Sequence, residues 1–307
     1  MTTETQATFT LPEPRPGQPY IEVSALEAGI LQLIHTRFMA GSQPGESTMC
    51  PSLAFSLRHS TTGEHLVFDM GIRRDMDVHP PAVQKSIKGR VIATPQSVDE
   101  SLRKGGIDPA EVKTVIVSHL HYDHVGDAAA FPKATFIMGG DAEEFLAHTY
   151  PTDPTSNVLQ TSIPIARTRF IGPSELTESI GPFPRAYDYF GDGSMYIVDA
   201  AGHLPGHVNI FARTNATGSW IYLAGDTAHD MALLTGEREV AFSFDDAGKM
   251  VCAHTDKDKA VEHIARVRQL LGVPKVQVLL AHDYVWYEAN KGGEAFLPGV
   301  IPPKLCM

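Results

Sequence analysis

Residues 114–131 read TVIVSHLHYDHVGDAAAF, and this stretch decides the fold. Residues 115–117 are three successive β-branched residues, which are typical of a buried strand. Just beyond them, within six positions, lie four side chains of metal-ligand type: His119, His121, Asp123 and His124. Imidazole nitrogen and carboxylate oxygen suit zinc and similar divalent ions. Because side chains alternate along an extended segment and a bend at Asp123 can bring His124 round, this one peptide can reach two adjacent metals.

Further ligand-type residues follow three later apolar segments. A strand expected at 195–199 leads into GHLPGH at 202–207, whose glycines let the backbone turn a histidine ring inward. The apolar segment 220–224 ends in Gly225 and Asp226, a position from which a carboxylate can bridge two metals. A buried strand expected at 276–281 is followed at once by His282. The sequence therefore places potential ligands at four separate strand ends.

These motifs together resemble the metallo-β-lactamase superfamily, and the resemblance covers nearly the whole chain. It implies an α+β fold, a four-layer αββα sandwich with a dinuclear site along one edge. In the family pattern the second histidine of the GHLPGH element binds metal, which is His207 here, while His203 supports the site or packs beside it. One metal is then expected to take His119, His121 and His207. The other takes Asp123, His124 and His282, and Asp226 bridges the two with a water or hydroxide.

The branch of the superfamily is indicated by Asp226, which true β-lactamases lack and which lactonases, glyoxalase II-type thioesterases and phosphodiesterases share. The motifs look most like those of quorum-quenching N-acyl homoserine lactonases and fungal γ-lactamases. Such lactonases commonly carry a tyrosine three residues after the bridging aspartate, and this chain has His229 there. His229 either donates a proton to a leaving group or only lines the pocket, and Asp123 is its rival as proton carrier.

The resulting hypothesis is a metal-dependent hydrolase with two divalent ions, zinc by default. It would open a small lactone or γ-lactam, such as a benzoxazolinone-type plant toxin, by attack of a metal-bridging hydroxide. The alternative on the same site is a glyoxalase II-like thioesterase or a phosphodiesterase. A non-catalytic member is a third class, and it is disfavoured because no ligand of the family pattern is missing.

Composition narrows the partners of the chain. Its 307 residues carry a formal net charge of −11, which disfavours nucleic acid as a partner and leaves a small-molecule substrate. No apolar run is long enough to span a membrane, so no membrane association is expected. The three cysteines are widely spaced and odd in number, which indicates free thiols and a cytoplasmic location: Cys50, Cys252 and Cys306. Oligomeric state stays open, and a homodimer is compatible with the sequence.

We expect residues 1–307 to form a single domain. Residues 1–23 are interpreted as an N-terminal arm, 72–97 as a loop excursion that walls the cleft, and 150–190 as an insertion that borders the active site. Strands are expected at 52–58, 65–69 and 134–138, and helices at 97–104 and 141–148. Asp69 either supports the metal loop or caps a turn. The aromatic side chains after the last ligand either wall the pocket or belong to the core or an interface: Tyr284, Trp286 and Tyr287.

Overall fold

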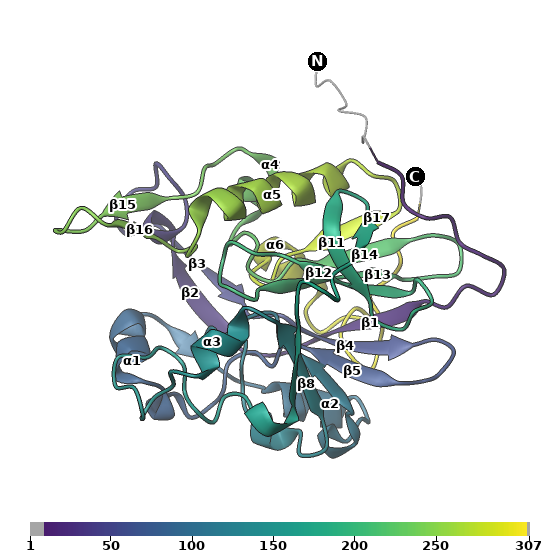
Figure 1. Cartoon of the computed structure of the whole chain (residues 1–307), viewed down its shortest axis with the longest axis horizontal. Coiled ribbons are helices and arrows are strands. Elements are labelled where there is room, and N and C mark those ends of the chain that lie inside the picture. The colour runs from purple at the N-terminus through teal and green to yellow at the C-terminus, as the bar shows by residue number, and fades with distance from the viewer. Residues whose placement is uncertain (1–8, 306–307) are drawn as a thin grey trace.

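Two six-stranded sheets pack against each other in the computed structural model, which describes residues 9–305 (Figure 1). The first sheet has the order β1 (Ile21–Leu26), β4 (Ala54–His59), β5 (His65–Phe68), β7 (Thr114–Ile116), β8 (Thr135–Gly139) and β9 (Thr168–Ile171). The second has the order β10 (Glu178–Ile180), β11 (Phe183–Asp188), β12 (Met195–Asp199), β13 (Val208–Arg213), β14 (Trp220–Leu223) and β17 (Val276–Leu279).

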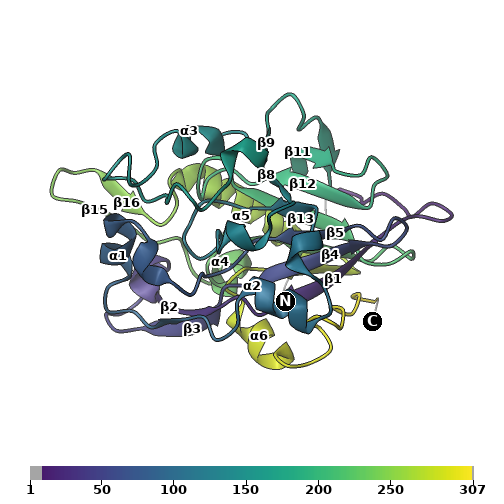
Figure 2. The same ribbon diagram turned by 90° about the horizontal axis from the view of Figure 1, so that it is seen from below.

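Helices cover the outer faces of both sheets. On the first sheet lies α2 (Val98–Lys104), which Figure 2 shows from below, and on the second lie α4 (Met231–Thr235) and α5 (Lys257–Leu271). A further short helix, α3 (Ala142–Leu146), follows β8. Single 3-10 turns join the elements: η2 (Met76–Val78), η3 (Pro109–Glu111), η4 (Ala128–Ala130) and η5 (Ile165–Arg167). The expected four-layer αββα sandwich is therefore confirmed.

The core lies in three layers that follow from this arrangement. Between the sheets, Leu57 and Ile116 of the first sheet pack in one cluster with Ile197, Ile210 and Leu223 of the second. The other faces of the strands are buried too, against the helices, as the continuous apolar runs of β7 and β14 require. Removing all these side chains from water is the dominant stabilising contribution to the fold.

Parallel pairing brings the strand ends of the ligand motifs together. Strands β5, β7 and β8 run parallel in the first sheet, and β14 and β17 run parallel in the second. The segments that leave the carboxyl ends of β5, β7, β14 and β17 therefore emerge at a shared edge of the sandwich, where the two sheets face each other. Every ligand motif of the sequence begins at this edge or, for GHLPGH, in the connection from β12 to β13.

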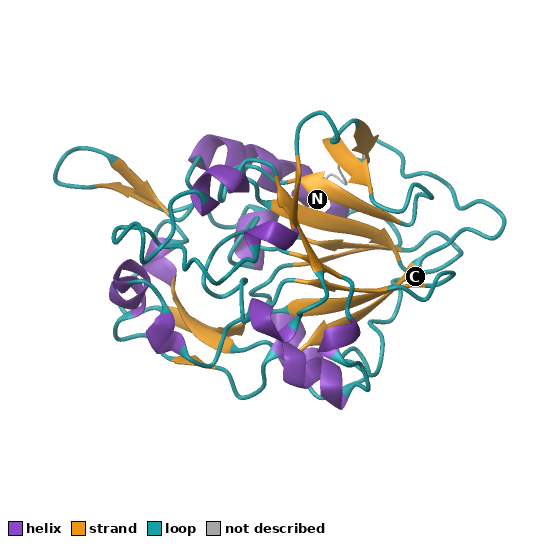
Figure 3. Ribbon diagram, turned by 60° about the horizontal axis from the view of Figure 1, so that its bottom comes forward, coloured by secondary structure: helices purple, strands orange, loops and turns teal. Residues whose placement is uncertain are grey.

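A third group of elements lies at one end of the molecule. It contains a three-stranded sheet of β3 (Ser47–Pro51), β2 (Ile30–Ile34) and β6 (Ile92–Ala93), with η1 (His35–Arg37) and α1 (Pro81–Ile87). The hairpin of β15 (Phe242–Phe244) and β16 (Met250–Cys252) projects from the body at the same end (Figures 1 and 3). The last helix is α6 (Tyr284–Asn290).

Several expectations about the layout need correction. The arm ends before residue 21, because residues 21–23 pair in β1, and its residues 1–8 lie outside the described residues. The segment 150–190 is not all insertion, since β9, β10 and β11 belong to the two large sheets. The segment 72–97 contains α1 and β6 rather than loop alone, and α5 was not anticipated. No helix among the described residues is long and apolar enough to cross a membrane.

Candidate metal centre

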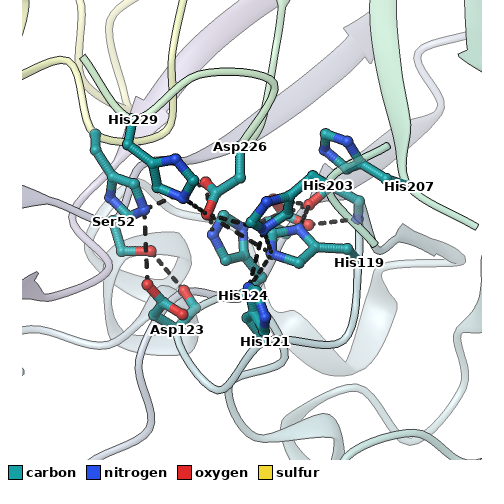
Figure 4. Close-up of polar contacts among 12 residues, drawn as sticks. Ser52, His119, His121, Asp123, His124, His203, His207, Asp226 and His229 are labelled. Atoms are coloured by element: carbon teal, nitrogen blue, oxygen red, sulfur yellow. Dashed lines mark hydrogen bonds and ion pairs between the residues drawn. The ribbon is translucent and has the colours of Figure 1, made fainter. Parts of the chain in front are cut away.

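Buried histidines and aspartates converge at the shared edge (Figure 4). They come from the loop after β7, the β12–β13 connection, the turn after β14 and the segment after β17. Their ligand atoms form two groups, each with all atoms within 4.8 Å of one another. One group is His119, His121, His203 and Asp226, and the other is Asp123, His124 and His282.

Three ring nitrogens face one another in the first group. The Nε2 atom of His203 lies 3.2 Å from Nε2 of His119 and 3.0 Å from Nδ1 of His121, and the last two atoms are 3.0 Å apart. The Asp226 Oδ2 atom approaches this cluster, at 3.7 Å from His119 Nε2 and 3.5 Å from His203 Nε2. Four donor atoms thus surround one small volume.

The other oxygen of Asp226 faces the second group. Its Oδ1 atom lies 3.1 Å from His124 Nε2 and 3.2 Å from His282 Nε2. The Oδ2 atom of Asp123 completes this group at 3.6 Å from His282 Nε2. The carboxylate of Asp226 therefore presents one oxygen to each group, which is the disposition of a bridging ligand.

The outer nitrogens of the rings are held by neighbouring groups. The Asp69 carboxylate accepts hydrogen bonds from the backbone N–H and the hydroxyl of Ser118, and its Oδ2 lies 2.7 Å from Nδ1 of His124. The Ser118 hydroxyl in turn lies 3.0 Å from Nδ1 of His119, and Nδ1 of His282 lies 2.8 Å from the Pro51 carbonyl. Protons on these outer nitrogens leave the Nε2 lone pairs free to face the site. Asp69 therefore supports the loop after β7, which carries the first four candidate ligands. This agrees with the first of its two interpretations.

His207 does not join either group, whereas His203 does. The His207 ring turns away, with Nδ1 3.1 Å from the Ala200 carbonyl and Nε2 3.4 Å from the amide nitrogen of Asn209 (Figure 4). It packs under the turn after β14, where a Cβ on Gly225 would lie 2.8 Å from His207 Nε2. The residue therefore buttresses the turn that carries Asp226. This geometry replaces the expected His207 with His203 among the candidate ligands.

His229 lies beside the cluster rather than within it. Its Nε2 atom is 3.3 Å from Asp226 Oδ2, and its ring packs at a tilt against Phe38 with centroids 4.3 Å apart. The Nδ1 atom is buried without a hydrogen-bond partner among the described residues. His229 therefore lines the cavity next to the oxygen that faces the first group of ligands.

Burial and the neighbouring carboxylates shift the pKa values of the clustered histidines in opposite directions. Burial lowers the pKa of His119 and His203 well below the usual value. Burial also opposes charge on His124, but the carboxylates of Asp226 and Asp69 outweigh it and raise its pKa to about 10. Asp226 likewise raises the pKa of His282. Without metal, the second group therefore holds protons where a divalent ion would otherwise balance the carboxylates.

Two buried polar atoms are paired only when His124 carries a proton, because the His124–Asp226 contact is then an ion pair. The Nε2 atom of His124 and the Oδ1 atom of Asp226 are buried and have no hydrogen-bond partner among the described residues, although they lie 3.1 Å apart. Buried polar atoms rarely stay unpaired in native proteins. A cation between them would satisfy both, and the nitrogen and oxygen donors suit zinc or a similar divalent ion.

A cavity of about 470 Å³ opens onto the cluster. Val83, Ser86 and Arg90 line it, so the expectation that 72–97 walls the cleft is met by α1 and the turn after it. Asn157 is the lining residue from the segment 150–190. Trp286 and Tyr287 do not line this cavity but pack against the core between the sheets. For these two residues the core interpretation holds, and the pocket-wall interpretation is wrong.

Two supporting residues were missed in the sequence. His254, before α5, is buried with its Nδ1 atom 3.2 Å from Nδ1 of His203. Ser52, before β4, donates a hydrogen bond to the Asp123 carbonyl. No ligand motif surrounds either residue, so only the fold brings them to the site.

A sandwich of two sheets with paired groups of metal-ligand side chains at the shared edge defines a class of metal-binding hydrolase folds. The model of the metallo-beta-lactamase superfamily matches residues 48–243, and the chain belongs to this superfamily.

Proteins similar to this chain are named for different activities. Cytochrome P450 monooxygenase mpaDE of Penicillium brevicompactum is 29% identical over 93% of this chain, and the chain spans only 36% of that protein. Gamma-lactamase MBL2 of Gibberella moniliformis is 37% identical over 53% of this chain and 70% of its own length. The structure of AiiA from B. thuringiensis, with N-decanoyl-L-homoserine bound at the active site, aligns with a TM-score of 0.67. That alignment has 18% identity, covers 91% of this chain and 98% of AiiA, and shows a shared fold.

Proposed function

We propose that this chain is a metal-dependent hydrolase that opens a small cyclic ester or cyclic amide, a lactone or a γ-lactam. The observation that carries the proposal is the Asp226 carboxylate, whose two oxygens face two different groups of ligand atoms. A site for one ion would need only one of the two groups. A carboxylate that faces both groups therefore favours two ions that share it.

In this proposal two divalent ions, zinc by default, are held by the chain. The first would be held by His119, His121 and His203, and the second by Asp123, His124 and His282, with Asp226 shared. His203 takes the place first given to His207, which is bound to the Ala200 carbonyl through its ring. When bound, such ions supply an activated water near neutral pH and Lewis-acid stabilisation of a carbonyl oxygen.

The remaining chemistry falls to side chains that can move a proton. Ring opening needs a proton on the leaving oxygen or nitrogen, and an amide nitrogen needs it more because it is the poorer leaving group. Two cavity-lining residues can supply it, Asp123 and His229. The Nε2 atom of His229 lies 3.3 Å from Asp226 Oδ2, beside the shared carboxylate, whereas its Nδ1 atom is buried; Nε2 is therefore the nitrogen that could carry a proton toward a substrate.

The substrate class is supported by the cavity and by the relatives. A volume of about 470 Å³ suits a small organic molecule rather than a polymer. Two kinds of relative are named for ring-opening activities, a gamma-lactamase and an N-acyl homoserine lactonase. A γ-lactam such as a benzoxazolinone is therefore a reasonable member of a first substrate panel.

The test is metal analysis coupled to hydrolysis of a matched panel. The purified protein is loaded with zinc, manganese, iron or cobalt, and the bound metal is counted. Hydrolysis is then measured on a γ-lactone, a γ-lactam, a thioester and a phosphodiester of similar size. We expect two metals per chain and turnover of a cyclic substrate that chelation abolishes. Turnover of only the thioester or the phosphodiester would overturn the proposed substrate class.

A further inference from the structure

The charged groups that line the cavity are unevenly placed. Among residues 9–305, the carboxylates that line it are Asp123 and Asp226 alone, and both belong to the candidate metal centre. In the same part of the chain, Arg37 and Arg90 are the lining residues with a lysine or arginine side chain, and neither belongs to that centre. The cavity therefore has an anionic, histidine-rich inner end and a wall that carries two guanidinium groups.

The two arginines come from elements that touch each other. Arg37 ends η1, Arg90 follows α1, and the Arg37 guanidinium donates a hydrogen bond of 3.2 Å to the carbonyl of Ser86 in α1. Ser86 and Val83 of the same helix also line the cavity. The three-stranded sheet and α1 lie together at one end of the molecule in two views (Figures 1 and 2). The two guanidinium groups are thus carried by one patch of the wall.

Neither guanidinium has a carboxylate within 4.0 Å among residues 9–305. Arginines nearby are paired: Arg73 with Asp75, Arg74 with Glu100 and Arg103 with Asp99. Acidic residues outnumber basic ones by 36 to 25 in this chain, so carboxylate partners are plentiful. Half of the 14 arginines have no such carboxylate among residues 9–305, but Arg37 and Arg90 are the two of them that line this cavity, where their charges are available to a bound anion.

The rest of the wall combines apolar side chains with several polar ones. Leu33, Phe38 and Val83 lie on the side of the arginines, and Phe242 and Val251 of the β15–β16 hairpin line the cavity as well. Phe242 and Val251 are each about half exposed, at 53% and 51%, although they are large and apolar. The wall thus offers apolar contact area together with two cations.

We propose that the substrate is an amphiphilic anion, with an apolar body and an oxyanion group that Arg37 and Arg90 bind away from the bond that is cleaved. Guanidinium groups bind carboxylate and phosphate oxygens through paired hydrogen bonds, and this directional binding would set the orientation of the substrate. The inference rests on the proposed function for the existence of a substrate in this cavity, but the binding preference is independent of which bond is broken.

The test measures binding without turnover. Equilibrium binding to the metal-loaded protein is measured by calorimetry for decanedioic acid and for its monoamide, which keeps one carboxylate and removes the charge of the other. We expect the diacid to bind about tenfold more tightly, in line with one charge-assisted contact. The double variant Arg37→Gln, Arg90→Gln should bind the diacid and the monoamide equally. The Arg90→Glu variant should bind the monoamide more tightly than the diacid. A decanoic chain with a terminal phosphonate distinguishes a preference for phosphate-type oxygens from one for carboxylate.

The matched control is Lys88→Gln, which removes the same charge from the turn beside Arg90 but lies outside the cavity lining. It should keep the tenfold preference. Equal binding of diacid and monoamide to the unmodified protein would overturn the inference, and so would an equal loss of preference in Lys88→Gln. If the panel of cyclic substrates fails while the diacid preference survives, the proposed reaction is wrong and the anion site stands.

Discussion

The substitution Asp69→Asn tests how the chain prepares His124 for metal. Asp69 is buried, with 1% of its surface exposed, and its backbone has a positive φ of 61°. Asparagine has nearly the same shape and tolerates this left-handed conformation, so the backbone should be preserved. The substitution removes the negative charge and replaces one acceptor oxygen by an NH₂ donor beside Ser118 and His124.

The expected cost follows from the three contacts of Asp69. The amide oxygen of asparagine can still accept the Ser118 N–H, but its NH₂ group now faces the Ser118 hydroxyl and Nδ1 of His124. Two charge-assisted contacts are lost, which we estimate to destabilise the metal-free fold by about 3–5 kcal/mol. A donor facing Nδ1 also favours the tautomer with its proton on Nε2, the atom that would bind metal. Metal affinity should therefore fall roughly 10–100-fold, as for other residues that orient a ligand.

The assay is urea unfolding of the metal-free protein together with competition for zinc by a chromophoric chelator. We expect one zinc per chain to be weakened and the other to change little, because Asp69 contacts His124 directly and touches the first group only through Ser118. The control is Asp188→Asn, a half-buried aspartate on β11 that accepts backbone N–H groups of Gly191 and Gly193. Unchanged zinc affinity in Asp69→Asn would refute the orienting role.

Three other predictions follow from the site. His203→Ala should remove one metal per chain, whereas His207→Ala should keep both and lower only stability; elemental analysis of both variants decides, and loss of metal from His207→Ala alone would reverse the assignment. His229→Gln should keep full metal content and lower kcat about 100-fold, as loss of a proton donor does; steady-state kinetics check this, and an unchanged kcat would leave His229 a lining residue. Burial lowers the pKa of His263 from its usual value to about 3. Its neutral ring contributes stability above about pH 6.5 that is lost as the pH falls toward 3, by roughly 3–5 kcal/mol in all. Urea unfolding of the metal-free protein across this range should show a shallower loss in His263→Gln, and equal slopes would contradict it.

The ligands that directly follow buried strands were predictable from the sequence. Asp226 and His282 are each the third residue after an apolar strand, and the strand fixes the direction in which the chain leaves the sheet. The same holds for the loop after β7. The family resemblance added the pairing of these motifs into two groups, and the structure brings the same motifs to one edge of the sandwich.

The choice between His203 and His207 depends on contacts that sequence spacing does not contain. Both residues follow a glycine in the same short element. The Ala200 carbonyl and the Asn209 amide, on either side of the turn, hold the His207 ring outside the cluster. The resemblance pointed to His207 because it carried over a motif position without these neighbours, whereas the geometry favours His203.

Other parts of the fold were missed for different reasons. Helix α5 carries a regular apolar stripe of Ala260, Ile264, Val267 and Leu270, a signal that was present in the sequence but not used. Strands β10 and β11 alternate weakly and are defined by pairing with each other and with β12. The β15–β16 hairpin exposes most of its apolar side chains, so no burial pattern marks it. Such elements depend on tertiary context rather than on local sequence.

The most direct measurement is the anomalous scattering of crystals of the zinc-loaded protein at the zinc absorption edge. Two peaks should flank the Asp226 carboxylate, one among His119, His121 and His203 and the other among Asp123, His124 and His282. A single peak, or a peak in contact with His207 instead of His203, would contradict the shared-carboxylate site on which the proposed hydrolysis depends.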